Sequence, residues 1–576
     1  MSDLTRRHFA LMGALGFGAA ACSSAEDVPP EVTTEDRIAA AEELLGVEFT
    51  EAERAQMAEG LAGGMDTLEA LRAFQKDNAL SPATVFDPRL PGVEYGLAGE
   101  GSVPPLPPMV DRRLSVSQML GSNEDIAFAS VERLRAALAG TDLTSERLTQ
   151  IYLDRIAEHG DALECFVTVT PELAMEQARE ADRRRAAGEN GPLLGIPYAA
   201  KDLFDTEGIL TTYGAEPFKD RVASKDAWVV ERLREAGAVL LGKTTLGALA
   251  YGDIWFGGRT NNPWNPAEGS SGSSAGSASA VAAGLCAFAL GTETLGSLVS
   301  PSTRCGTATL RPTFGMVPRT GAMALCWSMD KIGPIVRSAG DANLIMPTLT
   351  GTDAGDPSSL GGVYPPFVGS TGRKRVGYDP AWFEGADNAQ LAGLEAMRGI
   401  ANVVEVSDTL PDIPMGALSY ILLAEAAAAF EMLTLDGRDD LLKWQDDAAW
   451  PNTFRGARFI SGIDLVQAQR IRRLAMEHMH GVFEAVDALI SPPFAGGLLQ
   501  VTNYTGQPCV TVRAGFMDSA SRSLFGDSAE GDAETFRVPT SLCLWGGLFR
   551  DADIVELGAQ LENALEVAAE RPAGFG

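Results

Sequence analysis

The chain has 576 residues, carries a formal net charge of −31, and draws 45% of its residues from the hydrophobic set. This apolar fraction and a mean hydropathy near zero exclude a disordered chain and a protein with many membrane spans. The strong negative charge repels polynucleotides and anionic membrane surfaces, so nucleic acid is not expected as a partner. Seven cysteines show no metal-ligand spacing, and only four histidines offer a candidate base, so neither a metal site nor histidine-dependent catalysis is favoured.

Residues 1–22 resemble a bacterial export signal. They hold a Thr-Arg-Arg-x-Phe start and an apolar run over 9–21 that is too short to span a bilayer comfortably. Cys22 follows three alanines and resembles a lipobox cysteine, although Ala19 stands where leucine is usual. These features predict twin-arginine export to the periplasm or cell envelope, with membrane attachment through a lipidated Cys22. The alternative is cleavage nearby, which would leave the protein without a lipid anchor.

Residues 30–110 are interpreted as a helical N-terminal accessory segment. Thr or Asp precedes runs with apolar residues three and four apart, which is typical of capped amphipathic helices. The stretch 80–110 is rich in Pro and Gly and predicts an irregular strap.

Residues 120–570 are predicted to form one large α/β domain. Short apolar runs alternate with amphipathic helical patterns, which indicates a mixed central β-sheet covered by helices on both faces. Residues 385–490 read as mostly helical, and a strand pattern follows them.

Two motifs match familiar active-site patterns in letters alone. GAVLLGKT at 237–244 fits a phosphate-binding loop, but its four middle residues are apolar and predict a buried strand instead. GSSAG at 272–276 fits a nucleophile elbow and would make Ser274 the nucleophile. The only downstream histidines, His478 and His480, lie in a helical pattern two residues apart and are interpreted as surface positions.

A third set of motifs offers a lysine and several serines for catalysis without histidine. The chain contains GIPYAAKD at 195–202, SGSSAGSASAVAAG at 271–284 and GTETLGS at 291–297. A buried lysine acts as a base only when its pKa falls far enough for it to be neutral. These motifs, in this order, resemble those of the amidase signature family over about residues 120–570. The resemblance implies that family's fold, and hydrolysis of a small amide by a Ser-cisSer-Lys triad without metal or organic cofactor.

Carried over by position, the resemblance makes Lys201 the base, Ser273 the bridging cis-serine and Ser297 the nucleophile. The backbone amides of Thr294, Leu295, Gly296 and Ser297 would form the oxyanion hole. Negative charge that develops on the substrate carbonyl would be stabilised there. Ser274 and Ser277 are expected to orient the network.

The chain also departs from the family pattern. Leu298-Val299 follows Ser297 where many members have Ile-Arg, and Leu295 replaces a Gly or Asp, so its side chain is expected to crowd the acyl pocket. Arg311 stands where the family usually has lysine.

The sequence therefore predicts an exported amidase of unknown oligomeric state. An esterase or carbamate hydrolase with the same triad stays open. An amidotransferase subunit that acts on aminoacylated tRNA is disfavoured by the net charge of −31 and the export signal. A non-catalytic binding lipoprotein is disfavoured by the intact triad.

Overall fold

The computed structural model describes residues 33–58, 73, 77–80, 82–95, 116–361, 364, 373–524 and 534–575. The chain divides into two compact units, Met1–Gln75 and Lys76–Gly576. Residues 1–22 with Cys22 lie outside the described residues, so export and lipid attachment stay predictions. The domain boundaries proposed from the sequence, 30–110 and 120–570, stay predictions as well.

The first unit is helical where it is described. Helix α1, Thr34–Leu45, begins after Thr33, whose side chain accepts from the Asp36 N–H in a capping box. It ends at Gly46, which adopts the left-handed conformation with φ of 65°. A second helical stretch covers residues 51–58. The predicted N-terminal helical extension is therefore confirmed.

An eleven-stranded mixed sheet forms the centre of the second unit, in the order β1-β3-β2-β8-β10-β9-β14-β15-β13-β11-β12. Strands pair in parallel near both ends of this order and antiparallel through its middle. The strands are β1 Phe166–Val169, β2 Pro197–Lys201, β3 Val239–Thr244, β8 Phe288–Glu293, β9 Ala308–Arg311, β10 Lys331–Val336, β11 Arg375–Tyr378, β12 Asn402–Glu405, β13 Ala488–Ser491, β14 Cys509–Ala520 and β15 Thr535–Gly546. Two small ribbons pair β4 Ile254–Trp255 with β5 Gly258–Arg259, and β6 Asn261–Asn262 with β7 Asn265–Gly269.

Helices flank this sheet, as the sequence predicted. They are α3 Val116–Met119, α4 Asn123–Ala127, α5 Val131–Gly140, α6 Ser145–Leu163, α7 Pro171–Ala186, α8 Trp228–Glu235, α9 Ala275–Ala282, α10 Val299–Cys305, α11 Ala342–Leu349, α12 Asn388–Ile400, α13 Ser419–Ala429, α14 Glu431–Leu435, α15 Trp450–Ala457, α16 Gly462–Ala485, α17 Leu498–Thr505 and α18 Asp551–Leu565. The predicted helical region 385–490 is confirmed by α12 to α16. Within the described part of the chain, no helix combines the length and apolar character needed to cross a membrane.

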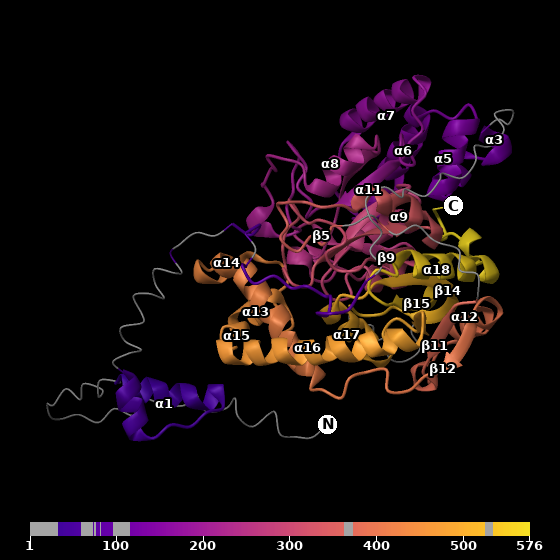
Figure 1. The fold of residues 1–576 in the computed structure, drawn as a ribbon. Helices are drawn as coiled ribbons and strands as arrows, with labels where there is room; N and C mark the ends of the chain where they lie inside the picture. The colour runs from indigo at the N-terminus through magenta and orange to yellow at the C-terminus, as the bar shows by residue number, and fades with distance from the viewer. Residues whose placement is uncertain are drawn as a thin grey trace. The chain divides into compact units, whose positions relative to one another are not determined.

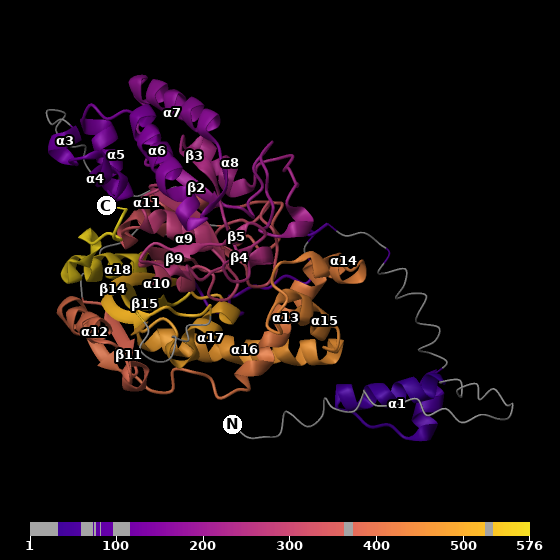
Figure 2. The ribbon, with the colours of Figure 1, turned by 180° about the vertical axis from the view of Figure 1, so that it is seen from behind.

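The two ends of the sheet come from different parts of the chain. In Figures 1 and 2, α5 to α8 lie at one end of the second unit and α12 to α16 toward the other. The C-terminal strands β14 and β15 return between them, which agrees with their central place in the strand order. Segments distant in sequence therefore meet in the middle of the sheet.

The segment 237–244 is a strand and not a phosphate-binding loop. Residues 239–244 of it form β3, which is buried along its whole length, and α8 precedes it. The backbone N–H groups of a strand bond to neighbouring strands and leave no nest for a phosphate. The prediction of a buried strand is confirmed.

Helix α9 lies close to the backbone of Cys165, just before β1, and of Thr245, just after β3, at Gly276. A Cβ atom built there would lie 2.3 Å from the Cys165 carbonyl oxygen and 2.5 Å from the Thr245 backbone nitrogen. Because both neighbours are backbone atoms, they cannot rotate away. Only glycine allows this packing, which fixes the helix that follows the serine-rich loop.

We expect Gly276→Ala to destabilise the protein by about 2 kcal/mol, because the added methyl group forces the backbone apart. The matched control is Gly481→Ala in α16, where a Cβ meets nothing within 4 Å. That change should stabilise the helix by about 0.5–1 kcal/mol through its intrinsic propensity. Denaturant unfolding of both variants checks this, and shifts of the same sign would contradict it.

Candidate active site

Lys201 is the last residue of β2 and is fully buried. The strand runs parallel to β3 on one side and β8 on the other, so the lysine lies inside the sheet region and not at its edge. Its amine lies 2.8 Å from Ser273 Oγ, 2.8 Å from Thr292 Oγ1 and 3.1 Å from Ser274 Oγ, and the Thr292 carbonyl oxygen lies 3.5 Å away.

Burial lowers the pKa of Lys201 well below its ordinary value, and the distant charges of Asp330 and Glu293 only partly oppose this. Among the described residues, no carboxylate lies within ion-pair distance of its amine. The neighbouring strand offers a contrast, since the buried Lys243 amine lies 3.2 Å from an Asp202 carboxylate oxygen. Lys201 is thus held in surroundings that favour the neutral amine, which can accept a proton from Ser273.

The serine-rich loop lies between β7 and α9, and its Gly272–Ser273 peptide bond is cis, as the resemblance implied. Ser273 is 1% exposed. A side chain at Gly272 would overlap the Gly252 carbonyl oxygen, since its Cβ would lie 1.8 Å away. The small residues of this loop therefore allow the backbone to approach closely, and the loop is not a linker.

Ser297 lies in the turn that joins β8 to α10. The turn contains Gly296 with φ of +85°, in the region that favours glycine. The Ser297 carbonyl accepts a hydrogen bond of 3.1 Å from the Ser274 N–H, so the turn lies directly against the serine-rich loop. Ser297 is 8% exposed, which makes it the most accessible member of the predicted triad.

Within the part of the chain that the structure describes, the backbone N–H groups of residues 294–297 donate to no other protein group. Unpaired amides beside a serine hydroxyl are the arrangement that stabilises an oxyanion. The structure thus brings the predicted oxyanion residues Thr294, Leu295, Gly296 and Ser297 into one turn with free donors. Their catalytic role stays a prediction.

The carboxylate of Glu293 holds this turn. It is fully buried, and its Oε2 accepts the N–H groups of Leu298 at 2.8 Å and Val299 at 3.0 Å, just after the turn. Its Oε1 accepts from Arg311 at 2.9 Å and from Asn503 at 2.7 Å. Strand β9 and helix α17 are thereby tied to both ends of the segment that carries Ser297.

Glu293 stays ionised in spite of its burial. Burial alone would raise its pKa, but the charges of Arg311 and Lys331 and the bonded amides lower the pKa to about 2. Arg311 is likewise fully buried and also donates to Thr502 Oγ1 at 2.8 Å. The arginine that differs from the family's usual lysine is thus the ion-pair partner of Glu293.

Sequence reasoning missed three residues of this network: Thr292, Glu293 and Asn503. Thr292 and Glu293 stand inside the GTETLGS motif, so their proximity to Ser297 in the sequence was a usable signal. Asn503 lies 210 residues from Glu293. It begins the segment NYTGQPCVTVRAG, which also resembles the family, but the sequence did not reveal its contact with Glu293. Ser277 bonds Thr244 Oγ1 and the Leu290 carbonyl and does not contact Lys201.

Leu295 is half-buried and packs against a small apolar cluster that includes Cys326, Leu418 and Tyr504. The cluster belongs to the region of α13, α16 and α17, so Leu295 connects the turn to this helical region. Whether it crowds an acyl pocket stays a prediction. His478 and His480 lie on α16, as expected, but both are half-buried, and His478 Nε2 is 2.9 Å from the Asp408 carbonyl.

The chain is similar to several known proteins over most of its length. The family model described as Amidase matches residues 147–514. A glutamyl-tRNA(Gln) amidotransferase subunit from Methylobacillus flagellatus is 33% identical over 501 residues, which cover 77% of this chain and 99% of that protein. The structure of peptide amidase from Stenotrophomonas maltophilia matches with a TM-score of 0.64 and 28% identity, over 78% of this chain and 98% of the other.

A bacterial aryl acylamidase has the same fold, with a TM-score of 0.64 at 21% identity over 77% of this chain and 99% of that one. The chain belongs to the amidase signature family. It is therefore an enzyme of a family that acts on carbon–nitrogen bonds of small amides.

We expect Glu293→Gln to lower the free energy of unfolding by about 3 kcal/mol at pH 7, because it leaves Arg311 buried without its anion. The folded-state pKa of Glu293 is lowered from 4.5 to about 2. Its ionic contribution is therefore complete above pH 4.5 and is lost as pH falls toward 2. The difference in free energy of unfolding between the wild type and the variant, measured by denaturant unfolding, should become smaller as pH falls over that range.

The matched control is Glu562→Gln in α18. Burial raises the pKa of Glu562 to about 7, so this carboxyl is stabilising when protonated and loses that contribution as pH rises. An amide has no such pH dependence, so Glu562→Gln should lower the free energy of unfolding more at acidic pH than at pH 7. Equal pH trends for the two variants would contradict the assigned ionisation states.

Proposed function

We propose that this protein is an exported hydrolase that cleaves a carboxylic amide at its C–N bond through an acyl-enzyme intermediate. The observation that carries the proposal is the 2.8 Å contact between the fully buried Lys201 amine and Ser273 Oγ. A lysine that burial keeps neutral can act as a base. The residue it contacts is Ser273, which the resemblance implies is the bridge to Ser297.

In this mechanism, Lys201 Nζ takes the proton of Ser273 Oγ as Ser273 takes the proton of Ser297 Oγ. The Ser297 oxygen forms a bond to the substrate carbonyl carbon, and the unpaired N–H groups of residues 294–297 stabilise the oxyanion. When the oxyanion collapses, the C–N bond breaks and the leaving amine takes its proton from Ser273, which regains one from Lys201. Water then attacks the acyl-enzyme by the same proton path and releases the acid.

Ester or carbamate hydrolysis is the second candidate, since the same groups would serve it. An amidotransferase subunit is favoured by the names of curated relatives such as that of Methylobacillus flagellatus. The formal charge of −31 counts against a tRNA partner, because phosphate repulsion would oppose binding. A binding lipoprotein without catalysis is opposed by the Lys201–Ser273 contact, since a binder has no need of a neutral lysine.

We expect Ser297→Ala to abolish both amide hydrolysis and covalent labelling by a fluorophosphonate, because the nucleophilic oxygen is absent. Loss of activity should reach about 10⁴-fold or more, as for other nucleophile deletions. Labelling is measured by intact mass, and hydrolysis by release of the amine from a panel of aryl, alkyl, peptide and cyclic amides.

Ser279→Ala is the control, since Ser279 is a buried serine of α9 whose hydroxyl donates to the Asn261 carbonyl. It should label and turn over like the wild type. Folded wild type that takes no label would exclude a catalytic Ser297, and turnover of esters without any amide would favour the second candidate.

We also propose export by the twin-arginine route with a lipid on Cys22, supported by the Arg6-Arg7 pair and the alanines before Cys22. Arg6→Lys together with Arg7→Lys should retain the protein inside the cell. Cys22→Ser should leave export intact and shift the protein from the membrane fraction to the soluble one. Fractionation with mass spectrometry of the mature N-terminus measures both, and an unprocessed wild-type N-terminus would contradict the proposal.

A further inference from the structure

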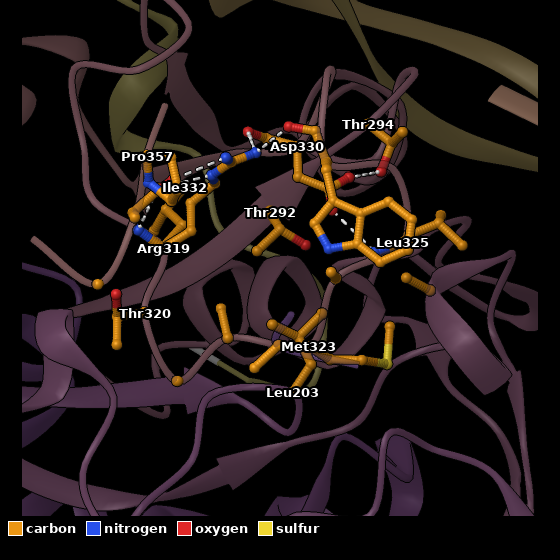
Figure 3. Close-up of a pocket in the computed structure, with 18 residues that line it drawn as sticks. Leu203, Thr292, Thr294, Arg319, Thr320, Met323, Leu325, Asp330, Ile332 and Pro357 are labelled. Atoms are coloured by element: carbon orange, nitrogen blue, oxygen red, sulfur yellow. Dashed lines mark hydrogen bonds and ion pairs between the residues drawn. The ribbon is translucent and has the colours of Figure 1, made fainter. Parts of the chain in front are cut away.

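A cavity adjoins the Lys201 side of the candidate site. Thr292, whose hydroxyl lies 2.8 Å from the lysine amine, and Thr294, at the start of the turn, both line it. Figure 3 shows Thr292 between Arg319 and Thr294, with Met323 and Leu203 across the cavity. The cavity is therefore adjacent to the Lys201–Ser273 pair. Leu295, which contacts the α13–α16 region, does not line it.

The charged groups around this cavity are paired with protein atoms. Arg319 bonds both carboxylate oxygens of Asp356 at 2.9 Å, together with the Trp327 carbonyl at 2.6 Å. Asp330 accepts from Thr294 Oγ1 at 2.5 Å and from the Leu325 N–H at 2.8 Å. Among the described residues that line the cavity, no charge is left over for an ionic ligand, and the remaining surface is formed largely by apolar and small residues.

One polar group of the lining residues has no partner. The indole N–H of Trp327 is buried and finds no acceptor among the described residues. A buried donor without an acceptor costs free energy, which a ligand that brings an acceptor would recover. The cavity therefore favours an uncharged, mostly apolar group that carries a hydrogen-bond acceptor.

A short segment before the sheet contributes the rim of this cavity. Asn78 holds the lining residue Ala324 through two hydrogen bonds, Nδ2 to its carbonyl at 2.9 Å and its N–H to Oδ1 at 2.8 Å. Ala79 lines the cavity and is exposed, which places it at the opening. Leu80 is 62% exposed and is not part of the lining.

We propose that this cavity receives the amine arm of the substrate and selects amides of neutral aromatic amines, with Ala79 limiting the size of that arm. The inference rests on the proposed function, in which Ser273 gives a proton to the leaving amine. Ser273 is held by Lys201, and the cavity meets Lys201 through Thr292. The leaving group on the Lys201 side of the scissile bond is therefore the one directed into it.

The electrostatics of the cavity select among amines. An alkyl amine becomes a cation after release at neutral pH, whereas an aromatic amine is a weak base and stays neutral. A cation in an apolar cavity without an unpaired anion is strongly disfavoured. Aromatic amines fit both the apolar lining and the absence of an unpaired charge, and a nitro or carbonyl substituent supplies an acceptor for Trp327.

The test uses one acyl group joined to ammonia, cyclohexylamine, aniline or 4-nitroaniline, with Ala79→Trp compared with Leu80→Trp. Ala79→Trp should lower kcat/KM for the two aryl amides by about tenfold and leave the ammonia amide unchanged. Leu80→Trp adds the same bulk on the same segment outside the lining and should change neither. Trp327→Phe should lower the preference for the nitroanilide over the anilide by about fivefold.

Binding of free 4-nitroaniline, followed by calorimetry, gives a readout that does not depend on turnover. The wild type should bind it, and Ala79→Trp should weaken binding by about tenfold. Equal losses for the ammonia amide and the aryl amides, or equal effects of the two tryptophan variants, would overturn the inference. Failure of the proposed function looks different: no amide turns over, while amine binding still responds to Ala79→Trp.

Discussion

The desolvation of Lys201 is the constraint on which the rest of the candidate site depends. A lysine in water is a cation and cannot act as a base, so the fold must keep both water and anions away from it. Strands β2, β3 and β8 surround it, and among the described residues its amine contacts hydroxyl groups and the Thr292 carbonyl oxygen. The nearby Lys243 is also buried in the sheet, but its amine lies 3.2 Å from an Asp202 carboxylate oxygen, whereas Lys201 has no such partner among the described residues.

The proposed oxyanion hole also depends on the turn 294–297 staying in place, although none of its four residues carries a charge. In the described part of the chain, the N–H groups of residues 294–297 have no hydrogen-bond partner, and Glu293 holds the turn from outside. That carboxylate takes two amides beyond the turn with one oxygen and bonds Arg311 and Asn503 with the other. One buried anion thus replaces the internal hydrogen bonds that the donors give up in order to face a substrate.

The local motifs of the site were predictable from the sequence, because each is short and continuous. The loop 270–274 consists of serine and glycine, whose small side chains indicated close backbone approach, and the turn 294–297 lies within the short GTETLGS motif. The strand nature of 237–244 followed equally from four consecutive apolar residues. The sheet order was not accessible, since β13 to β15 pair beside β9 from nearly two hundred residues away, and no local pattern encodes that partner.

Long-range partners were out of reach for the same reason. Asn503 contacts Glu293 and Asn78 contacts Ala324, and in each pair the two residues lie more than two hundred positions apart in the chain. Residues 77–80 fell within a segment interpreted as an accessory region. Two of them, Asn78 and Ala79, instead contribute to the cavity beside Lys201. The sequence did not predict this, because the contacts of an irregular segment leave no periodic pattern.

The neutral lysine also limits what the enzyme can accept. An anionic group beside Lys201 would raise its pKa and return it to the charged form, which cannot take a proton from Ser273. A water-filled cavity would act in the same direction by reducing desolvation. In the proposed mechanism, the pairing of Arg319 with Asp356 and the apolar lining therefore favour the neutral lysine as well as the proposed selectivity. A histidine base, whose ordinary pKa lies near neutrality, would tolerate a wet or charged pocket, and a lysine base does not.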